Sequence, residues 1–289
     1  MSRTDARIRE MQFLARLDRG ELEFVAPPER VEDQQMIMSF IADGYCNDGL
    51  DALERLTRLM PHQITDTQES ERSRSMLKVI RRVPLTLKIT HKGRVRLSEL
   101  QQQLRTGRGR DPTELCVAMR HMETELAIAL LSASNETPLS VAYLDMNGLK
   151  AINDKHRHAG GNRAIKAYLE AVIATFGERG EAYRGEGSDE VVVILPNVDD
   201  AAAAKLLDNF ARQLAKDPLV LDGEELILTA SCGSACTTDP NLDAKTIGDL
   251  ADKAQYRAKY ESKKHDPRVS AIAVGAGDVK IFNPHTRDV

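Results

Sequence analysis

The chain has 289 residues, of which 42% are hydrophobic, and a formal net charge of −4 at pH 7. This length and apolar content suffice for two globular domains. No apolar run is long enough for a membrane span and the start, MSRTDARIREMQF, lacks the features of a secretory signal, so we expect no membrane contact and a cytoplasmic location. The four cysteines are then expected to be reduced thiols.

The N-terminal part predicts short helices followed by a hairpin. Amphipathic patterns indicate helices over 34–42, 50–60 and 65–75. Apolar runs over 76–80 and 85–89 predict two strands around the sequence RRVP, and Thr90 is a suitable N-cap for a helix that runs to about Leu104. We therefore expect a first domain over residues 1–105.

Positive charge gathers in the same region. Twelve lysines and arginines lie between residues 72 and 110, against the single acid Glu99. Helices followed by a basic hairpin resemble a winged-helix module, and ITHKGRVRLSEL resembles the exit from the hairpin of such a domain. The resemblance implies that Arg81 and Arg82 contact DNA phosphates, or that the module serves in dimerisation. Either role gives the domain a DNA or protein partner.

A linker and an entry helix are expected next, over residues 106–133. The sequence TGRGRDP (106–112) has the composition of a linker, and the pattern over 113–133 predicts a helix that leads into the second domain.

Two acidic turns follow. The apolar run 139–144 predicts a buried strand with Asp145 at its end, and the next five residues turn the chain into an amphipathic helix whose first N–H groups suit phosphate oxygens. Later, Gly185, Gly187 and Ser188 predict a sharp reversal before the acids DE (189–190) and a strand over 191–195. Carboxylates at two neighbouring strand ends are a means of holding a divalent metal beside a nucleoside triphosphate.

These segments resemble the GGDEF family of nucleotide cyclases. The segments DMNGLKAIND (145–154) and HAGGN (158–162) are similar to the family patterns DxDxFKxIND and HxxGD, and GSDEV (187–191) stands in the place of the signature. The strand at 229–235 and the helix ADKAQYRAK (251–259) complete the set. The resemblance implies an α/β (α+β) fold, with a palm-like, antiparallel-rich central sheet flanked by helices over 134–275, and a C-terminal tail over 276–289.

The resemblance also implies the roles of individual residues. Asp145, Asp189 and the Met146 carbonyl would hold two Mg²⁺ (or Mn²⁺) ions, while Glu190 would be either a second metal ligand or the general base. The expected nucleotide-binding residues are Asn147, Gly148, Leu149, Lys150, Asn153, Asn162, Lys259 and Lys263. Family members carry arginine at the last place, so Lys263 keeps the charge but loses the bidentate fork.

The reaction implied is the condensation of two GTP molecules to cyclic di-GMP and pyrophosphate across a homodimer. Asn162 replaces the aspartate that would read guanine, which leaves ATP as an alternative substrate. Ser188 and Val191 also depart from the signature, and serine would be strained if that position required a positive φ. The alternative function is a catalytically degenerate, nucleotide-responsive regulator that acts through the winged helix.

Two cysteines, Cys232 and Cys236, have a spacing that could suggest zinc. No second pair and no nearby histidine completes such a site, so we interpret them as small strand residues.

Overall fold

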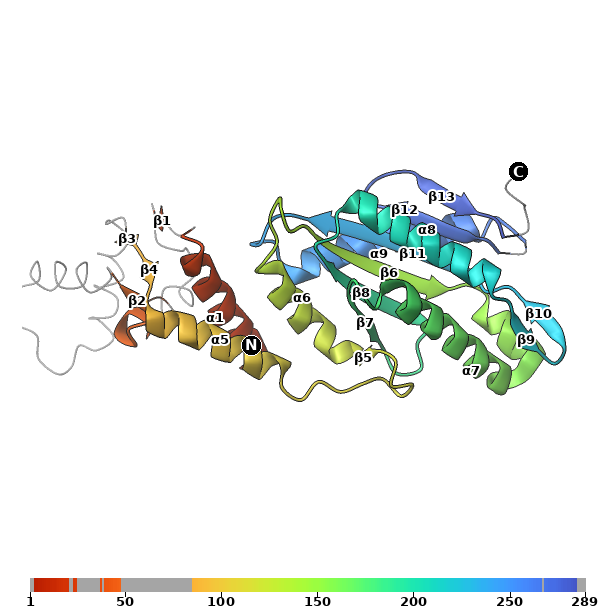
Figure 1. The fold of residues 1–289 in the computed structure, drawn as a ribbon, viewed down its shortest axis with the longest axis horizontal. Coiled ribbons are helices and arrows are strands. Elements are labelled where there is room, and N and C mark those ends of the chain that lie inside the picture. The colour runs from red at the N-terminus through yellow and green to blue at the C-terminus, as the bar shows by residue number, and fades with distance from the viewer. Residues whose placement is uncertain are drawn as a thin grey trace, which may run out of the picture. The chain divides into compact units, whose positions relative to one another are not determined.

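A computed structural model describes residues 3–20, 23–24, 37, 39–47, 85–266 and 268–284. The chain divides into two compact units, Met1–Thr106 and Gly107–Val289 (Figure 1). The helices expected over 50–60 and 65–75, the strand over 76–80, Arg81 and Arg82 lie outside the described residues, so the winged-helix assignment stays a prediction. Within the described ranges, no helix is long and apolar enough to cross a membrane.

The first unit contains two longer helices, α1 (Arg3–Asp18) and α5 (His91–Arg105). The predicted cap is confirmed, because the Thr90 hydroxyl accepts a hydrogen bond from the Gly93 N–H at 3.0 Å. Helix α1 was not predicted from the sequence. Its Glu10 carboxylate binds the Arg96 guanidinium of α5 at 2.8 Å.

The strand predicted over 85–89 divides into two short strands. The predicted hairpin would pair residues 85–89 with the strand over 76–80. The pairs described instead join 85–89 to two segments that precede that hairpin. The antiparallel pairs are β1 (Glu23–Phe24) with β3 (Leu85–Thr86) and β2 (Cys46–Asn47) with β4 (Lys88–Ile89).

A seven-stranded mixed sheet forms the centre of the second unit, in the order β13-β12-β11-β6-β8-β7-β5. Four of its six strand pairs are antiparallel and two are parallel, which confirms the antiparallel-rich expectation. A separate hairpin joins β9 and β10. The strands are β5 (Val117–Ala118), β6 (Leu139–Met146), β7 (Glu181–Arg184), β8 (Glu190–Pro196), β9 (Leu219–Leu221), β10 (Glu224–Leu226), β11 (Ala230–Thr237), β12 (Ser270–Val274) and β13 (Val279–Phe282).

Helices cover both faces of the sheet (Figure 1). Alternate residues of the central strand β6 point to opposite faces. Ala142, Leu144 and Met146 join the core beneath α7 and α8, whereas Tyr143 and Asp145 face α9, against which α6 packs. The second unit's helices are α6 (Met122–Leu130), α7 (Leu149–Phe176), α8 (Asp200–Lys216) and α9 (Ala244–Ser262).

The entry helix is shorter than predicted, because α6 starts at Met122 rather than at residue 113. The Asp111 carboxylate accepts hydrogen bonds from the Thr113 hydroxyl at 2.7 Å and from the Cys116 N–H at 3.0 Å. Such side-chain to backbone contacts compete with helix formation. The chain instead makes a turn, and β5 then pairs in parallel with β7.

The predicted tail also belongs partly to the domain. Residues 276–289 were expected to form a C-terminal tail outside the domain, whereas β13 pairs antiparallel with β12 and forms an edge of the sheet. The domain therefore extends to at least Phe282.

Helix α7 is interrupted near its first third. Arg157 has φ 62° and ψ 178°, a backbone region occupied almost only by glycine. Just before this kink, His156 Nδ1 lies 2.7 Å from an Asp222 carboxylate oxygen, and Lys155 contacts Glu224. The β9–β10 hairpin is thereby fastened to the kinked segment.

Candidate functional site

Asp145 is the penultimate residue of β6, and its side chain is on the face of the sheet that α9 covers. Its side chain is only 4% exposed, and one carboxylate oxygen accepts a hydrogen bond from the Lys259 ammonium at 2.6 Å. Burial raises the pKa of the Asp145 carboxyl, and Lys259 offsets only part of that rise. The site therefore contains a desolvated carboxylate that is hydrogen-bonded to the Lys259 ammonium.

The strand register brings the second acidic turn beside the first. Asp145 is opposite Glu190 in the antiparallel β6–β8 pair, and the Asp189 carbonyl accepts the Met146 N–H at 3.5 Å. The Asp189 side chain is half-buried and lines the same cavity as Asp145, whereas Glu190 is exposed and is not among the cavity's lining residues. Two of the three predicted acids thus share one cavity.

Asn147 anchors the turn between β6 and α7 from inside the protein. Its amide nitrogen donates to Ser262 Oγ at 3.1 Å and to the Val269 carbonyl at 3.0 Å, and its amide oxygen accepts from Ser231 Oγ at 2.8 Å. Its backbone N–H donates to the Thr229 carbonyl at 2.8 Å. The Asn147 N–H is therefore already hydrogen-bonded within the protein, whereas the resemblance implied that Asn147 contributes to nucleotide binding.

The start of α7 has backbone N–H groups that can bind phosphate oxygens. Gly148 caps the helix with φ 77°, a left-handed conformation that glycine adopts without a steric penalty. The first N–H groups of a helix have no partner within the helix and carry a partial positive charge. Leu149, Lys150 and Ala151, which open the helix, all line the cavity. This helix start is a suitable place for phosphate oxygens.

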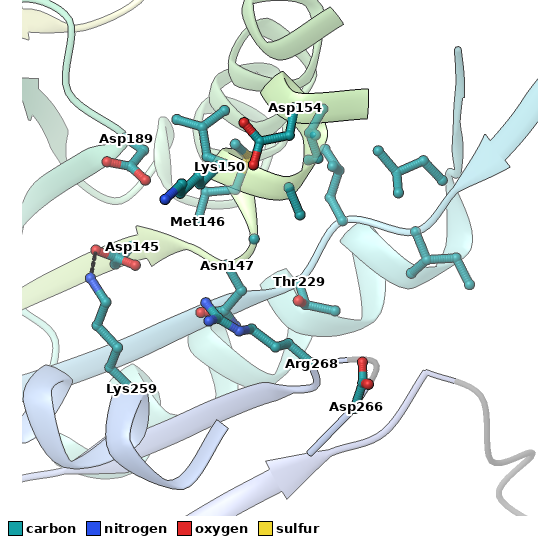
Figure 2. A pocket seen from close by; sticks show the side chains of 17 residues that line it. Asp145, Met146, Asn147, Lys150, Asp154, Asp189, Thr229, Lys259, Asp266 and Arg268 are labelled. Carbon is teal, nitrogen blue, oxygen red and sulfur yellow. Dashed lines mark hydrogen bonds and ion pairs between the residues drawn. The ribbon is translucent and has the colours of Figure 1, made fainter. Parts of the chain in front are cut away.

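The cavity at the end of β6 has a volume of about 590 Å³ (Figure 2). The β6–α7 turn and α7 form one wall, and the segment from Leu226 to Thr229 after the β9–β10 hairpin forms another. Both signs of charge are present. The charged side chains that line it are Asp145, Asp154, Asp189, Asp266, Lys150, Lys259 and Arg268.

Three predicted nucleotide-binding residues do not line this cavity. Asn153 packs against Gly161, where an added Cβ would lie 2.0 Å from the Asn153 amide oxygen. Asn162 is exposed, and Lys263 is exposed at the C-cap of α9. In contrast, Arg268 lines the cavity but was missed, because it lies in an irregular segment with no local motif.

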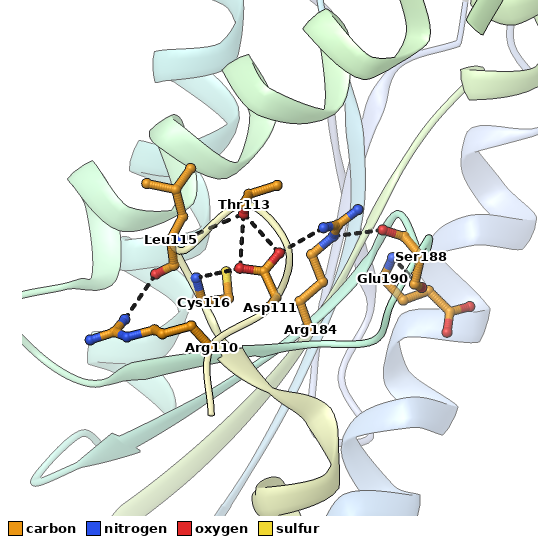
Figure 3. Close-up of polar contacts among 8 residues, drawn as sticks. All are labelled: Arg110, Asp111, Thr113, Leu115, Cys116, Arg184, Ser188 and Glu190. Atoms are coloured by element: carbon orange, nitrogen blue, oxygen red, sulfur yellow. Dashed lines mark hydrogen bonds and ion pairs between the residues drawn. The ribbon is translucent and has the colours of Figure 1, made fainter. Parts of the chain in front are cut away.

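A buried ion pair stabilises the signature turn at residues 187–191 (Figure 3). The Arg184 guanidinium donates to an Asp111 carboxylate oxygen at 2.7 Å and to the Ser188 carbonyl at 2.7 Å. Both charged side chains are buried, with exposed fractions of 4% and 0%. Arg184 therefore connects the segment that enters the domain to the residue immediately before Asp189.

Ser188 causes no backbone strain in this turn. The positive φ of 71° belongs to Gly187, and Ser188 is not among the residues with positive φ. The Ser188 hydroxyl accepts the Glu190 N–H at 3.0 Å, which stabilises the turn. Because the Ser188 φ is not positive, replacing glycine by serine at this position adds no backbone strain.

Oxygen donors at this site fit a hard divalent cation. Magnesium is commonly held by one or two carboxylates together with phosphate oxygens and water. Asp145 and Asp189 line the cavity, and with the Met146 carbonyl they would provide such a partial set. Among the described residues no three His, Cys, Asp or Glu side chains gather closely enough to form a metal site by themselves. The protein's share of the coordination would thus need to be completed by a phosphorylated ligand.

The two cysteines considered for zinc lie on β11, as expected for strand residues. Burial raises the pKa of the Cys232 thiol well above its ordinary value. The Cys236 thiol contacts the Val198 carbonyl at 3.8 Å. Neither is directed at the cavity described above.

Fold and site together define a mixed-sheet domain with a charged cavity at the end of its central strand. Residues 116–265 match the family described as "Diguanylate cyclase, GGDEF domain". Since these residues make up just over half of the chain, the protein belongs to the GGDEF family.

Curated relatives share this region. The chain is 25% identical over 132 residues to diguanylate cyclase A of Treponema denticola, covering 46% of this chain and 35% of the relative. It is 30% identical over 139 residues to the uncharacterized protein YhcK of Bacillus subtilis, covering 47% and 38%. The matches thus span little more than a third of these relatives.

A solved structure supports the fold. The coiled coil and GGDEF domain of DgcB from Caulobacter crescentus, in complex with c-di-GMP, superposes with a TM-score of 0.50 at 19% identity. The alignment covers 73% of this chain and all of the other. The likeness confirms the mixed sheet flanked by helices.

Proposed function

We propose that the second unit is a diguanylate cyclase, which condenses two GTP molecules to cyclic di-GMP and two pyrophosphates. The observation that carries the proposal is the arrangement of Asp145, Asp189 and Lys259 around one cavity, in a chain of the GGDEF family. The name of the Treponema denticola relative supports the same activity.

A metal ion belongs to the proposal. Asp145, Asp189 and the Met146 carbonyl would hold Mg²⁺ or Mn²⁺, which would neutralise phosphate charge as the α-phosphorus is attacked. Lys259 now donates to Asp145 at 2.6 Å. Once that carboxylate holds a metal ion, the Lys259 ammonium would turn to a phosphate oxygen, which keeps its charge paired.

The remaining chemistry concerns one proton and one leaving group. The 3′-hydroxyl oxygen of one nucleotide forms a bond to the α-phosphorus of the other, and the bond from that phosphorus to the bridging oxygen breaks, releasing pyrophosphate. Glu190 would accept the hydroxyl proton of the second nucleotide, because it lies opposite Asp145 in the strand pair, outside the cavity, and its side chain is exposed. The start of α7 would bind the phosphates.

Each such domain would bind one nucleotide, so the reaction requires two copies with their cavities facing each other. Tyr256 and Tyr260 support this arrangement, since both are exposed, at 69% and 59%, on either side of Lys259 along α9. They offer exposed aromatic surface on the helix that carries Lys259. The proposed active form is therefore a homodimer.

The test is product analysis of the full chain with Mg²⁺ and GTP, ATP or both. Asp189→Asn should abolish cyclic dinucleotide formation, whereas Glu186→Gln, an exposed acid in the same turn that does not line the cavity, should retain it. The purine of the product would report on the role of Asn162. Equal turnover in both variants would refute the assigned site.

The regulator remains the second candidate, and one contact favours it. In the described structure Asp145 is paired with Lys259, and in a regulator this pair would persist while a nucleotide bound without a metal ion on this carboxylate. Retained GTP binding with no product at any protein concentration would assign this function instead.

A further inference from the structure

The cavity contains a cation that no sequence motif assigns. Three basic side chains line it: Lys150, Lys259 and Arg268. The resemblance places the second phosphate-binding cation at Lys263, but Lys263 is exposed at the C-cap of α9 and is not among the lining residues. Arg268 lies five residues further along the chain and does line the cavity.

Arg268 differs from Lys259 in its hydrogen bonding. Lys259 is paired with Asp145 at 2.6 Å. No hydrogen bond or ion pair joins the Arg268 side chain to another residue in the part of the chain that the structure describes. Figure 2 shows Lys259 and Arg268 entering from the side of α9 and β12, across the cavity from Lys150 and Asp154. The guanidinium is thus available to an anionic ligand.

The backbone next to Arg268 is fixed by buried hydrogen bonds. The carbonyl of Val269 accepts from Ser262 Oγ at 2.7 Å and from the Asn147 amide nitrogen at 3.0 Å. Ser262, Val269 and Asn147 are all buried. Because Asn147 belongs to the β6–α7 turn, these bonds tie the backbone beside Arg268 to the helix start that would receive the phosphates.

We infer that Arg268 is the second phosphate-binding cation of this site and binds the outer phosphates of the nucleoside triphosphate in place of Lys263. The inference rests on the proposed function and deepens it. An arginine there restores the planar, bidentate donor that lysine at position 263 lacks. It also brings a third positive charge to a cavity that is lined by four aspartates.

Equilibrium binding tests the assignment without turnover. The ligand is a GTP analogue with a methylene bridge between its α- and β-phosphates, measured by calorimetry on the full chain with Mg²⁺. Arg268→Ala should weaken binding about 10- to 100-fold, as expected for the loss of hydrogen bonds to a charged group. Lys263→Ala, the matched control, should change the affinity less than about twofold, since Lys263 does not line the cavity and its charge is exposed to water.

Two further measurements make the result specific. Arg268→Lys should recover part of the affinity, because it keeps the charge and loses only the fork. GMP, which has no outer phosphates, should bind the wild type and Arg268→Ala equally. Both substituted residues are exposed, so thermal unfolding should be unchanged and a folding defect is readily detected.

The outcomes separate the inference from the function it rests on. The inference is wrong, while the proposed function stands, if the wild type binds the analogue and Lys263→Ala weakens this binding but Arg268→Ala does not. Equal weakening of GMP and the analogue by Arg268→Ala would also overturn the assignment to outer phosphates. If the wild type binds no triphosphate, the proposed function itself fails.

Discussion

Breaking the buried ion pair behind the signature turn should destabilise the second unit strongly. Arg184 and Asp111 are 2.7 Å apart and their side chains are at most 4% exposed. Arg184→Met removes the cation and leaves a buried carboxylate, a change that typically costs about 3–5 kcal/mol. Thr113 and Cys116 would still donate to Asp111, so we expect the lower end, about 3 kcal/mol. For a unit of this size that corresponds to a fall in melting temperature of about 6–12 °C.

The assay is thermal unfolding of the full chain, followed by circular dichroism. The matched control is Lys245→Met, which breaks the pair with Asp249 at a similar distance of 2.8 Å but with side chains that are 72% and 53% exposed. An exposed pair of this kind contributes less than about 0.5 kcal/mol. Adding Asp111→Asn to Arg184→Met should recover much of the loss, because the unpaired charge is then absent. Equal melting temperatures for Arg184→Met and Lys245→Met would refute the reasoning.

The pH dependence provides a second check on the same pair. Burial alone would raise the pKa of the Asp111 carboxyl, but the hydrogen bonds from Thr113, Arg184 and Cys116 outweigh it and the pKa is lowered below 3.8. The group therefore contributes stability at neutral pH that is lost as the pH falls through its lowered pKa. In Arg184→Met burial should prevail and the pKa should rise. The stability difference between the wild type and the variant should then shrink in acid, and a constant difference would contradict this account.

Three further predictions concern single positions. Arg157→Gly should raise the free energy of unfolding by about 1 kcal/mol, because glycine relieves the positive φ in α7; a lower melting temperature would show that the kink is not strained. Asp145→Asn should abolish turnover and leave thermal stability at neutral pH unchanged or increased. Burial raises the pKa of the Asp145 carboxyl, so above that pKa the charged form is the one that costs stability. A large loss of stability would contradict this. Cys116 and Cys232 should resist alkylation in the native protein, because burial raises the pKa of the Cys116 thiol to about 11 and that of Cys232 further; rapid labelling followed by mass spectrometry would disprove their burial.

Local patterns predicted the elements around the site well. The apolar runs gave β6 and β8 with small errors at their ends, and Thr90 marked the start of α5 correctly. Period-two alternation places Asp145 on the face opposite Leu144, which is why it meets Lys259 of α9. Where one face of a strand or helix is buried, the spacing of residues carries this information.

Contacts between distant segments could not be predicted in this way. Asp111 and Arg184 are 73 residues apart, and neither has a local pattern that names its partner. The entry helix was placed too early for a related reason, since the turn at Asp111 depends on that buried pair. Arg268 reaches the cavity because Asn147 and Ser262 fix the carbonyl of Val269, a contact across the sheet that no motif records.

The most direct test of the central claim is the stoichiometry of the reaction with the wild-type full chain, Mg²⁺ and GTP. Cyclic di-GMP and pyrophosphate are quantified together over a series of protein concentrations. The account predicts two pyrophosphates for each cyclic di-GMP, with a rate per protein molecule that rises with protein concentration as the homodimer forms. GTP that is bound but left unchanged at every concentration would contradict the cyclase and assign the domain to nucleotide binding alone.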